Sequence, residues 1–168
     1  MPVETFTLEH RLWPACVEHM ERVGMAQWVL DDKRQPKPGI YFLGVVEGDA
    51  VVGHITLLLQ DLVCPETAWS SGMDRTVRLP DGEPLRETFV QTFAVDEAYR
   101  RRGYGLALQK AALALTRELG CYQIRSWSSL DKPANYALKL SLGFAVHPAT
   151  YEAPGGQQVS GVYFVKTV

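Results

Sequence analysis

The sequence has few of the features that are typical of secreted or membrane-spanning proteins, and few cysteines. Its 168 residues include three cysteines, an odd number with no C-x-x-C pair, so we expect no disulfide framework and a reducing, cytoplasmic compartment. The longest strongly apolar runs, such as Ile55 to Leu59, are far too short to span a bilayer. Met1 to Thr5 lacks the basic and apolar stretches of a signal peptide. We therefore expect no membrane association.

An excess of positive charge is also missing. The chain has 17 Lys and Arg against 19 Asp and Glu, a net charge of −2, so we expect no nucleic-acid partner. With 46% hydrophobic and 21% charged residues, its composition is that of a soluble globular protein. The length suits a single domain covering residues 1–168.

Periodicity predicts helices that interleave with a mixed sheet. Apolar and polar alternation indicates strands at Val3–Leu8, Ile40–Val46, Ala50–Leu59, Thr88–Val95, Tyr122–Trp127 and Val159–Val165. Helical spacing or capping indicates helices around Trp13–Met20, at Met25–Leu30, at Gly105–Leu119, and from Asp131 to Gly143. The unit from Thr88 to Trp127 predicts a right-handed βαβ crossover.

The stretch from Gln60 to Glu87 is long for a connection and is interrupted by prolines and glycines. Such a segment is either functional or forms short strands of its own, for which Thr76–Leu79 is a candidate.

The segment from Val95 to Leu106 has the composition of a phosphate-binding turn. A predicted strand ends there and a long helix begins, so unpaired backbone N–H groups coincide with the positive end of a helix dipole. Gly103 and Gly105 permit close approach of a ligand to the backbone. Three cations precede them: Arg100, Arg101 and Arg102. An arginine run alone indicates a solvated loop, but the flanking strand and glycines favour a phosphate site.

Two common nucleotide-binding patterns are excluded. No Gly-Lys-Ser/Thr of a P-loop occurs in the chain, and G-x-G-x-x-G fails because Leu108 stands in place of the third glycine. The motif Arg100-x-x-Gly103-x-Gly105 instead resembles the [RQ]-x-x-G-x-[GA] signature of the GNAT acetyltransferases. Two further segments support that resemblance: Val52-Gly53-His54-Ile55 and Leu142-Gly143-Phe144. The resemblance covers roughly Ile40 to Phe144.

This resemblance implies the acyl-CoA N-acyltransferase fold, an α/β (α+β) architecture with a mixed, mostly antiparallel sheet of about six to seven strands and about four helices. It implies acetyl-CoA as co-substrate and no metal. The pyrophosphate is expected on the backbone amides of Arg101, Arg102, Gly103, Tyr104, Gly105 and Leu106. The pantetheine arm is expected beside Phe93, Ala94 and Val95, with the fourth and fifth strands splayed, and Asn135 corresponds to an asparagine that contacts pantetheine or water.

The catalytic base and acid are less well defined. Members of the family often carry a Glu or His on the fourth strand, where this chain has Gln91 and Phe89. Glu87, on the same strand parity as Val95, is our first candidate for the base. His54 is the second, and Gln91 can orient an amine or water. An exposed carboxylate at a strand end and a histidine buried in the core are the plainer interpretations of these two candidates.

For the acid, the family's tyrosine position holds Lys139, and Tyr136 lies one turn earlier on the same helix. Tyr136 is our candidate, although the residue could equally pack in the core, and the acid can be absent because a thiolate is a tolerable leaving group.

The expected reaction is direct attack of an amine, from a small molecule or a peptide, on the acetyl thioester. The acceptor site is expected from the first helices, the last hairpin and the 60–87 segment, which offers Trp69, Met73, Asp74, Arg75 and Arg78. Asp61, Glu66 and Asp74 could recognise a cationic substrate, although ordinary solvation of a loop is the preferred interpretation of these carboxylates. Proteins that resemble this one often form homodimers. Two alternatives remain: a non-catalytic acyl-CoA-binding module, and an O-acyltransferase or a user of longer acyl groups.

Overall fold

A computed structural model describes residues 3–64, 70–152 and 156–168. Its strands are β1 (Val3–Phe6), β2 (Ile40–Glu47), β3 (Ala50–Asp61), β4 (Arg86–Val95), β5 (Gln123–Ser129), β6 (Ala145–Glu152) and β7 (Gln158–Thr167). Its α-helices are α1 (Trp13–Arg22), α2 (Ala26–Val29), α3 (Tyr104–Glu118) and α4 (Pro133–Ser141), and a short 3₁₀ turn spans Glu97–Tyr99. The predicted mixed, mostly antiparallel architecture is confirmed.

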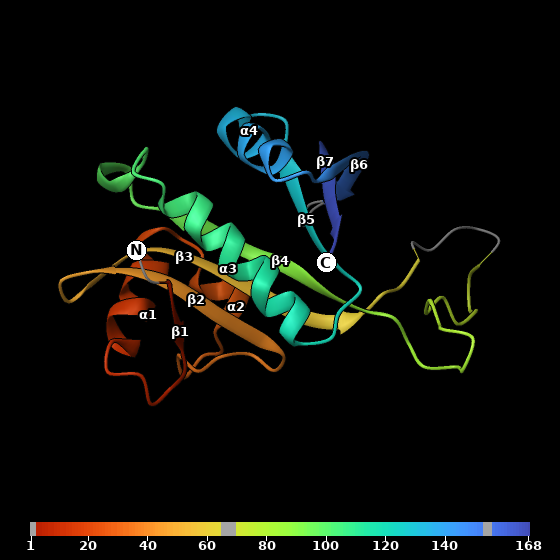
Figure 1. The fold of residues 1–168 in the computed structure, drawn as a ribbon, viewed down its shortest axis with the longest axis horizontal. Coiled ribbons are helices and arrows are strands. Elements are labelled where there is room, and N and C mark those ends of the chain that lie inside the picture. The colour runs from red at the N-terminus through yellow and green to blue at the C-terminus, as the bar shows by residue number, and fades with distance from the viewer. Residues whose placement is uncertain (1–2, 65–69, 153–155) are drawn as a thin grey trace.

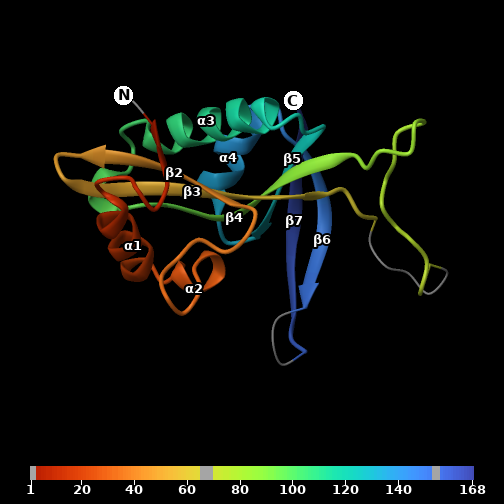
Figure 2. The ribbon, with the colours of Figure 1, turned by 90° about the horizontal axis from the view of Figure 1, so that it is seen from below.

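Within the described residues, the strands form one seven-stranded sheet in the order β1-β2-β3-β4-β5-β7-β6. Neighbouring strands are antiparallel except β4 and β5, which pair in parallel. Helix α3 lies between these two strands in the chain and connects them. Figure 2 shows α3 on one face of the sheet and α1 and α2 on the other. The fold therefore has three layers around β2, β3 and β4.

Each face of the sheet has its own apolar core. Leu108 and Ala112 of α3 are fully buried against Ile55 and Leu57 of β3 in the larger core. The opposite face packs α1 and α2 against the sheet through residues such as Met20. Burying a side chain such as Leu108 contributes roughly 1.5–3 kcal/mol, so these contacts are what hold α3 against the sheet. The predicted apolar stripe of the long helix is confirmed.

The central strands separate after a short region of pairing. β4 and β5 pair only from Glu87 to Phe89, opposite Gln123 to Arg125. Beyond these residues, β4 continues beside β3 while β5 pairs with β7, so an opening forms between β4 and β5. Figure 1 shows the two strands diverging, with α4 beyond the end of β5. The splayed strands that the family resemblance implies are present.

A β-bulge interrupts β4 at the edge of this opening. Thr56 pairs with Thr92 and Leu57 with Val90, which leaves Gln91 as the extra residue. A bulge shifts the alternation of side chains by one position. Consequently, odd-numbered residues of β4 before Gln91 and odd-numbered residues after it face opposite sides of the sheet.

One local expectation is wrong, and one strand was not predicted. Thr76–Leu79 is not a strand; the segment makes isolated bridges, Val63 with Thr76 and Arg78 with Pro84, and projects away from the sheet (Figure 1). Strand β6, which pairs along β7, had no separate prediction. Cys64 is exposed, whereas Cys16 and Cys121 are buried, and all three are free thiols. Glu66 and Trp69 lie outside the described residues.

No helix in the described ranges has both the length and the apolar composition needed to cross a membrane.

Candidate active site

A cavity of about 1100 Å³ occupies the opening between β4 and β5. Its walls come from β4 beyond Phe89, from Ser126 to Ser129 of β5, from the start of α3 and from α4. Met25 and Trp28, at α2, line its other end together with Tyr163 of β7. The cavity is therefore bounded by elements from both faces of the sheet.

The turn into α3 presents a row of unused backbone donors. Gly103 caps the helix with a φ of 85°, and Arg101 has a φ of 65°. In the described residues, the N–H groups of residues 101–106 have no hydrogen-bond acceptor, and the first intrahelical donor is Ala107, which bonds the carbonyl of Gly103. Most residues of this turn line the cavity. A row of free N–H groups at a helix N-terminus is a site for an anion such as phosphate.

The three arginines of this turn differ in their contacts. Arg100 donates through Nε to the carbonyl of Val95 over 3.0 Å. The guanidinium of Arg102 lies 5.1 Å from the ring centre of Tyr99. Arg100 and Arg101 line the cavity, so they are the two arginines of this turn that can meet an anionic ligand there.

The exposed edge of β4 supplies further backbone groups. The N–H of Asp96 bonds the carbonyl of Val52 on β3, and successive residues of a strand direct their N–H groups to alternate sides. The N–H of Val95 therefore points away from β3, into the opening. Phe93 lies at the same phase of the strand, and both residues line the cavity. An extended ligand can hydrogen-bond along this edge as an added strand does.

Opposite this edge, Asn135 of α4 also lines the cavity. Its amide nitrogen donates to Oγ of Ser128 over 3.2 Å, which ties the start of α4 to the end of β5. The structure thus brings Phe93, Ala94, Val95, Arg100, Arg101, Gly103, Tyr104, Gly105, Leu106 and Asn135 to one cavity.

A sequence model described as the Acetyltransferase (GNAT) family matches residues 4–144. The chain belongs to the GNAT acetyltransferase family. No curated protein matches it.

Solved structures share the fold at low sequence identity. Arabidopsis thaliana NAA60 in complex with acetyl-CoA has a TM-score of 0.70 at 12% identity, covering 99% of each chain. An aminoglycoside 6'-N-acetyltransferase complexed with coenzyme A has a TM-score of 0.65 at 13% identity, covering 99% of this chain and 97% of that one. The Escherichia coli ribosomal-protein-S18-alanine N-acetyltransferase has a TM-score of 0.59 at 15% identity, covering 99% and 94%.

In this GNAT protein, Glu87 lies outside the cavity wall. Its carboxylate is fully buried and accepts hydrogen bonds from Gln60 (2.8 Å), Gln123 (2.8 Å) and Arg125 (2.6 Å). The expectation that Glu87 shares a face with Val95 is wrong, because the bulge at Gln91 shifts the alternation. The Glu87–Arg125 pair lies where β4 and β5 still pair, so it stabilises the closed end of the opening.

Tyr136 faces away from the cavity as well. Its ring packs edge-on against Phe164 of β7, with 5.0 Å between ring centres, and its hydroxyl has no partner among the described residues. Gln91 does line the cavity, at the bulge. Arg102 does not line it, although its neighbours in the turn do.

The ionisable residue of α4 that lines the cavity is Lys139. It is only 1% exposed, and its Nζ donates to Oε1 of Gln109 over 2.8 Å and lies 4.4 Å from the ring centre of Phe144. It makes no ion pair with a carboxylate in the part of the chain that the structure describes. Burial lowers the pKa of Lys139 to about 7, so this amine can both release and accept a proton near neutral pH.

His54 is also fully buried, and it bonds a second buried histidine, His19 of α1, which sequence reasoning did not select. His19 lies on the apolar side of its helix near Cys16 and Met20, where a histidine gives no signal of its partner on a distant strand. Burial lowers the pKa of His54 to about 3, so it is not a base that gains a full charge at neutral pH.

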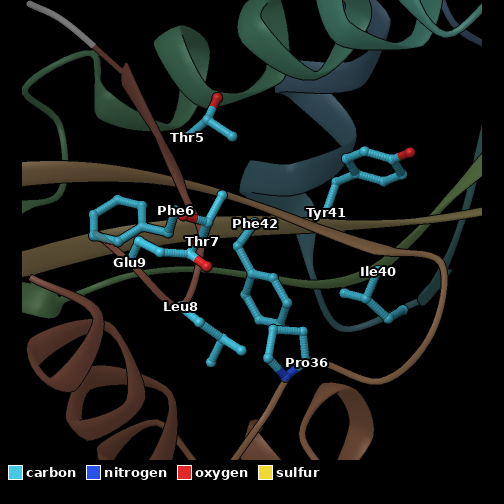
Figure 3. Close-up of a pocket in the computed structure, with 9 residues that line it drawn as sticks. All are labelled: Thr5, Phe6, Thr7, Leu8, Glu9, Pro36, Ile40, Tyr41 and Phe42. Carbon is cyan, nitrogen blue, oxygen red and sulfur yellow. The ribbon is translucent and has the colours of Figure 1, made fainter.

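A second hollow, of about 410 Å³, lies at the β1 edge of the sheet (Figure 3). It lies between β1 with its following turn and β2, and Leu8, Pro36 and Phe42 are among the apolar residues that line it. It shares no lining residue with the cavity between β4 and β5. No three His, Cys, Asp or Glu side chains within residues 3–64, 70–152 and 156–168 are grouped so that they could hold a metal ion.

Replacing Glu87 tests whether this carboxylate is structural. We expect Glu87→Gln to lower the free energy of unfolding by about 2–3 kcal/mol, because it leaves the Arg125 guanidinium, whose side chain is 20% exposed, without its counter-charge. Urea unfolding measures this loss. The pH dependence of turnover should keep its shape. A shifted acidic limb of the pH–rate profile in a stable variant would instead return Glu87 to the reaction.

Lys139 should make stability depend on pH. Its pKa in the folded chain is about 7 against an ordinary 10.5, so the folded state favours the neutral amine. The free energy of unfolding should therefore rise between these two pH values, by on the order of 5 kcal/mol in total, and stay flat below them. Lys139→Met should abolish the rise, whereas Lys110→Met, on the exposed side of α3, should keep it. Identical pH curves for both variants would contradict the buried-amine assignment.

Proposed function

We propose that the whole chain, residues 1–168, acts as one acetyltransferase domain that transfers the acetyl group of acetyl-CoA to an amine of a small molecule or peptide. The observation that carries this proposal is the row of free N–H groups at residues 101–106 beside a cavity between separated strands. A diphosphate supplies the acceptors that these donors lack. The GNAT family and the acetyl-CoA and CoA complexes of proteins with this fold support the same ligand.

The cofactor would extend from this turn into the opening. The pyrophosphate would lie on the amides of residues 101–106, near Arg100 and Arg101, and the pantetheine arm along Phe93 to Val95. The N–H of Val95, directed into the opening, is the donor placed to stabilise the oxyanion of the tetrahedral adduct. Asn135 lies across the opening, where its amide carbonyl can accept a bond from the pantetheine or from water.

Lys139 replaces Tyr136 and Glu87 in our assignment of groups that exchange protons with the reacting atoms. Its ammonium would protonate the departing thiolate, and the resulting neutral amine would take a proton from the adduct nitrogen. A pKa of about 7 suits both transfers. Gln91, at the bulge, would orient the attacking amine.

The acceptor would enter from the side of α2 and β7, because Met25, Trp28 and Tyr163 line that end of the cavity. No described residue of the segment between Gln60 and Arg86 lines it. The acceptor surface is thus mainly aromatic and apolar in the described residues, which suits an amine on an apolar or aromatic carrier better than a polycation.

A turnover assay tests the reaction itself. We expect thiol release from acetyl-CoA with at least one amine of a panel containing amino acids, short peptides, arylalkylamines, polyamines and aminoglycosides, with mass spectrometry locating the acetyl group. Thermal stabilisation by CoA without turnover on any amine would favour a non-catalytic acyl-CoA-binding module. Acetylation of a hydroxyl would favour an O-acyltransferase.

A pair of glycine variants tests the cofactor turn. A Cβ at Gly105 would lie 3.4 Å from Phe93 and 3.5 Å from Leu138, which are ordinary contacts, so Gly105→Ala should fold and bind CoA. Gly105→Asp should weaken CoA binding about 100-fold or more, because it places a carboxylate beside the diphosphate. Calorimetric titration with CoA measures both. Equal affinity of the two variants would place the diphosphate elsewhere.

A further inference from the structure

A chain of buried hydrogen bonds leads away from the cavity through the sheet. Thr92, which lines the cavity, has its Oγ1 2.9 Å from Nε2 of His54 on β3. Nδ1 of His54 lies 2.9 Å from Nε2 of His19 on α1. The three residues are 4%, 1% and 0% exposed, respectively. A buried polar group is tolerated when its donors and acceptors are satisfied, and here every ring nitrogen has a partner.

The far end of this chain reaches the surface. Nδ1 of His19 lies 3.2 Å from Oδ1 of Asp96 and 3.1 Å from a guanidinium nitrogen of Arg22. The Asp96 side chain is 19% exposed and also pairs with Arg22 over 2.7 Å. The hydrogen bonds thus connect the cavity wall to a carboxylate in contact with water.

The hydrogen bonds of this series can have their donors and acceptors arranged in either direction. A neutral imidazole has one donor nitrogen and one acceptor nitrogen. In one arrangement, Thr92 donates to His54, His54 donates to His19, and Nδ1–H of His19 donates to Asp96. In the other, His19 donates to His54, His54 donates to Thr92, and the bare Nδ1 of His19 accepts from Arg22. Both arrangements are fully hydrogen-bonded at both ends, and they differ by the shift of one proton per link.

Burial disfavours the charged form of both rings. His19 is faced by Arg22, Asp96 and His54, and burial lowers its pKa more than Asp96 raises it. His54 is faced by His19 and Thr92, and burial followed by the neighbouring His19 lowers its pKa. A neutral imidazole can pass a proton on by exchanging tautomers, so transfer along these rings would not require either ring to hold a charge.

We propose that Thr92, His54, His19 and Asp96 form a proton relay that removes a proton from the ammonium group of the acceptor. The proposal rests on the acetyltransferase function proposed above, and it supplies the base that β4 lacks at Phe89 and Gln91. Thr92 contacts the amine, and the two histidines and Asp96 act through it.

Each transfer in the relay conserves protons and charge. The ammonium N–H passes to Thr92 Oγ1 as the Thr92 hydroxyl proton passes to His54 Nε2. The His54 Nδ1 proton passes to His19 Nε2, and the His19 Nδ1 proton passes to the Asp96 carboxylate. The amine and Asp96 end neutral, and the free amine attacks the thioester. After the products leave, a proton returned from Asp96 to water in the cavity restores the first arrangement.

The test compares two variants of Thr92 that differ by one hydroxyl. Thr92→Val keeps the side-chain shape and removes the hydroxyl, whereas Thr92→Ser keeps the hydroxyl. With the panel amine of highest turnover, we expect kcat/KM of the Val variant at pH 7 to fall about 100-fold, and the Ser variant to recover most of that loss. Above the pKa of the amine the two should converge, because a free amine needs no base. The Kd for CoA should be the same in both.

Several outcomes would overturn the relay. Equal kcat/KM values of the Val and Ser variants at pH 7 would show that the Thr92 hydroxyl only packs. A difference in kcat/KM that does not change with pH would show the same. Asp96→Asn should reproduce the pH-dependent loss, and full activity of that variant at pH 7 would exclude Asp96 as the terminal acceptor. If the wild-type protein did not bind CoA, the proposed function would be refuted instead. Failure of the relay can therefore be distinguished from failure of the acetyltransferase proposal.

A measurement on the rings does not depend on turnover. The chain has four histidines, so ¹⁵N-labelled imidazoles can be assigned by single substitutions. We expect His54 to stay neutral from pH 6 to 8, and both rings to show ¹⁵N shifts averaged between the two tautomers at pH 8. A single fixed tautomer in both rings, unchanged when CoA is added, would contradict the relay even if every panel amine were inert.

Discussion

The structure depends on the short parallel pairing between β4 and β5. The strands pair from Glu87 to Phe89 and then separate, because β4 continues along β3 and β5 turns to β7. A strand edge exposed in this way would be a liability on a surface. Here it faces a cavity, and its N–H groups, together with those at the start of α3, are available to a ligand.

The buried ionisable groups around this opening differ in how many hydrogen bonds they make. The Glu87 carboxylate accepts bonds from three side chains at the closed end and does not line the cavity. Lys139, by contrast, has one hydrogen bond and no ion pair among the described residues, and burial brings its pKa to about 7. The same desolvation that disfavours a charged lysine thus makes it useful for proton transfer.

The histidine pair shows how the two faces of the sheet are connected. His19 belongs to α1 and His54 to β3, and together they join a carboxylate at the protein surface to a hydroxyl in the cavity wall. The bulge at Gln91 makes this geometry possible, because it turns Thr92 toward Thr56 and His54 while Phe93 and Val95 face α3. One inserted residue therefore lets β4 direct Phe93 and Val95 to one face of the sheet and Thr92 to the polar chain on the other.

The sequence by itself determined the elements that local chemistry controls. The apolar stripe of α3, the glycines at 103 and 105, and the motif beginning at Arg100 predicted the helix, the tight turn before it and the family, because propensity and backbone freedom act within a few residues. Only the tertiary structure decided which side chains meet across the opening. The bulge moved Glu87 to the other face, α4 turned Lys139 rather than Tyr136 toward the cavity, and the packing of α1 on β3 paired His19 with His54. These outcomes depend on strand register, helix rotation and contacts between residues far apart in the chain, which no local pattern records.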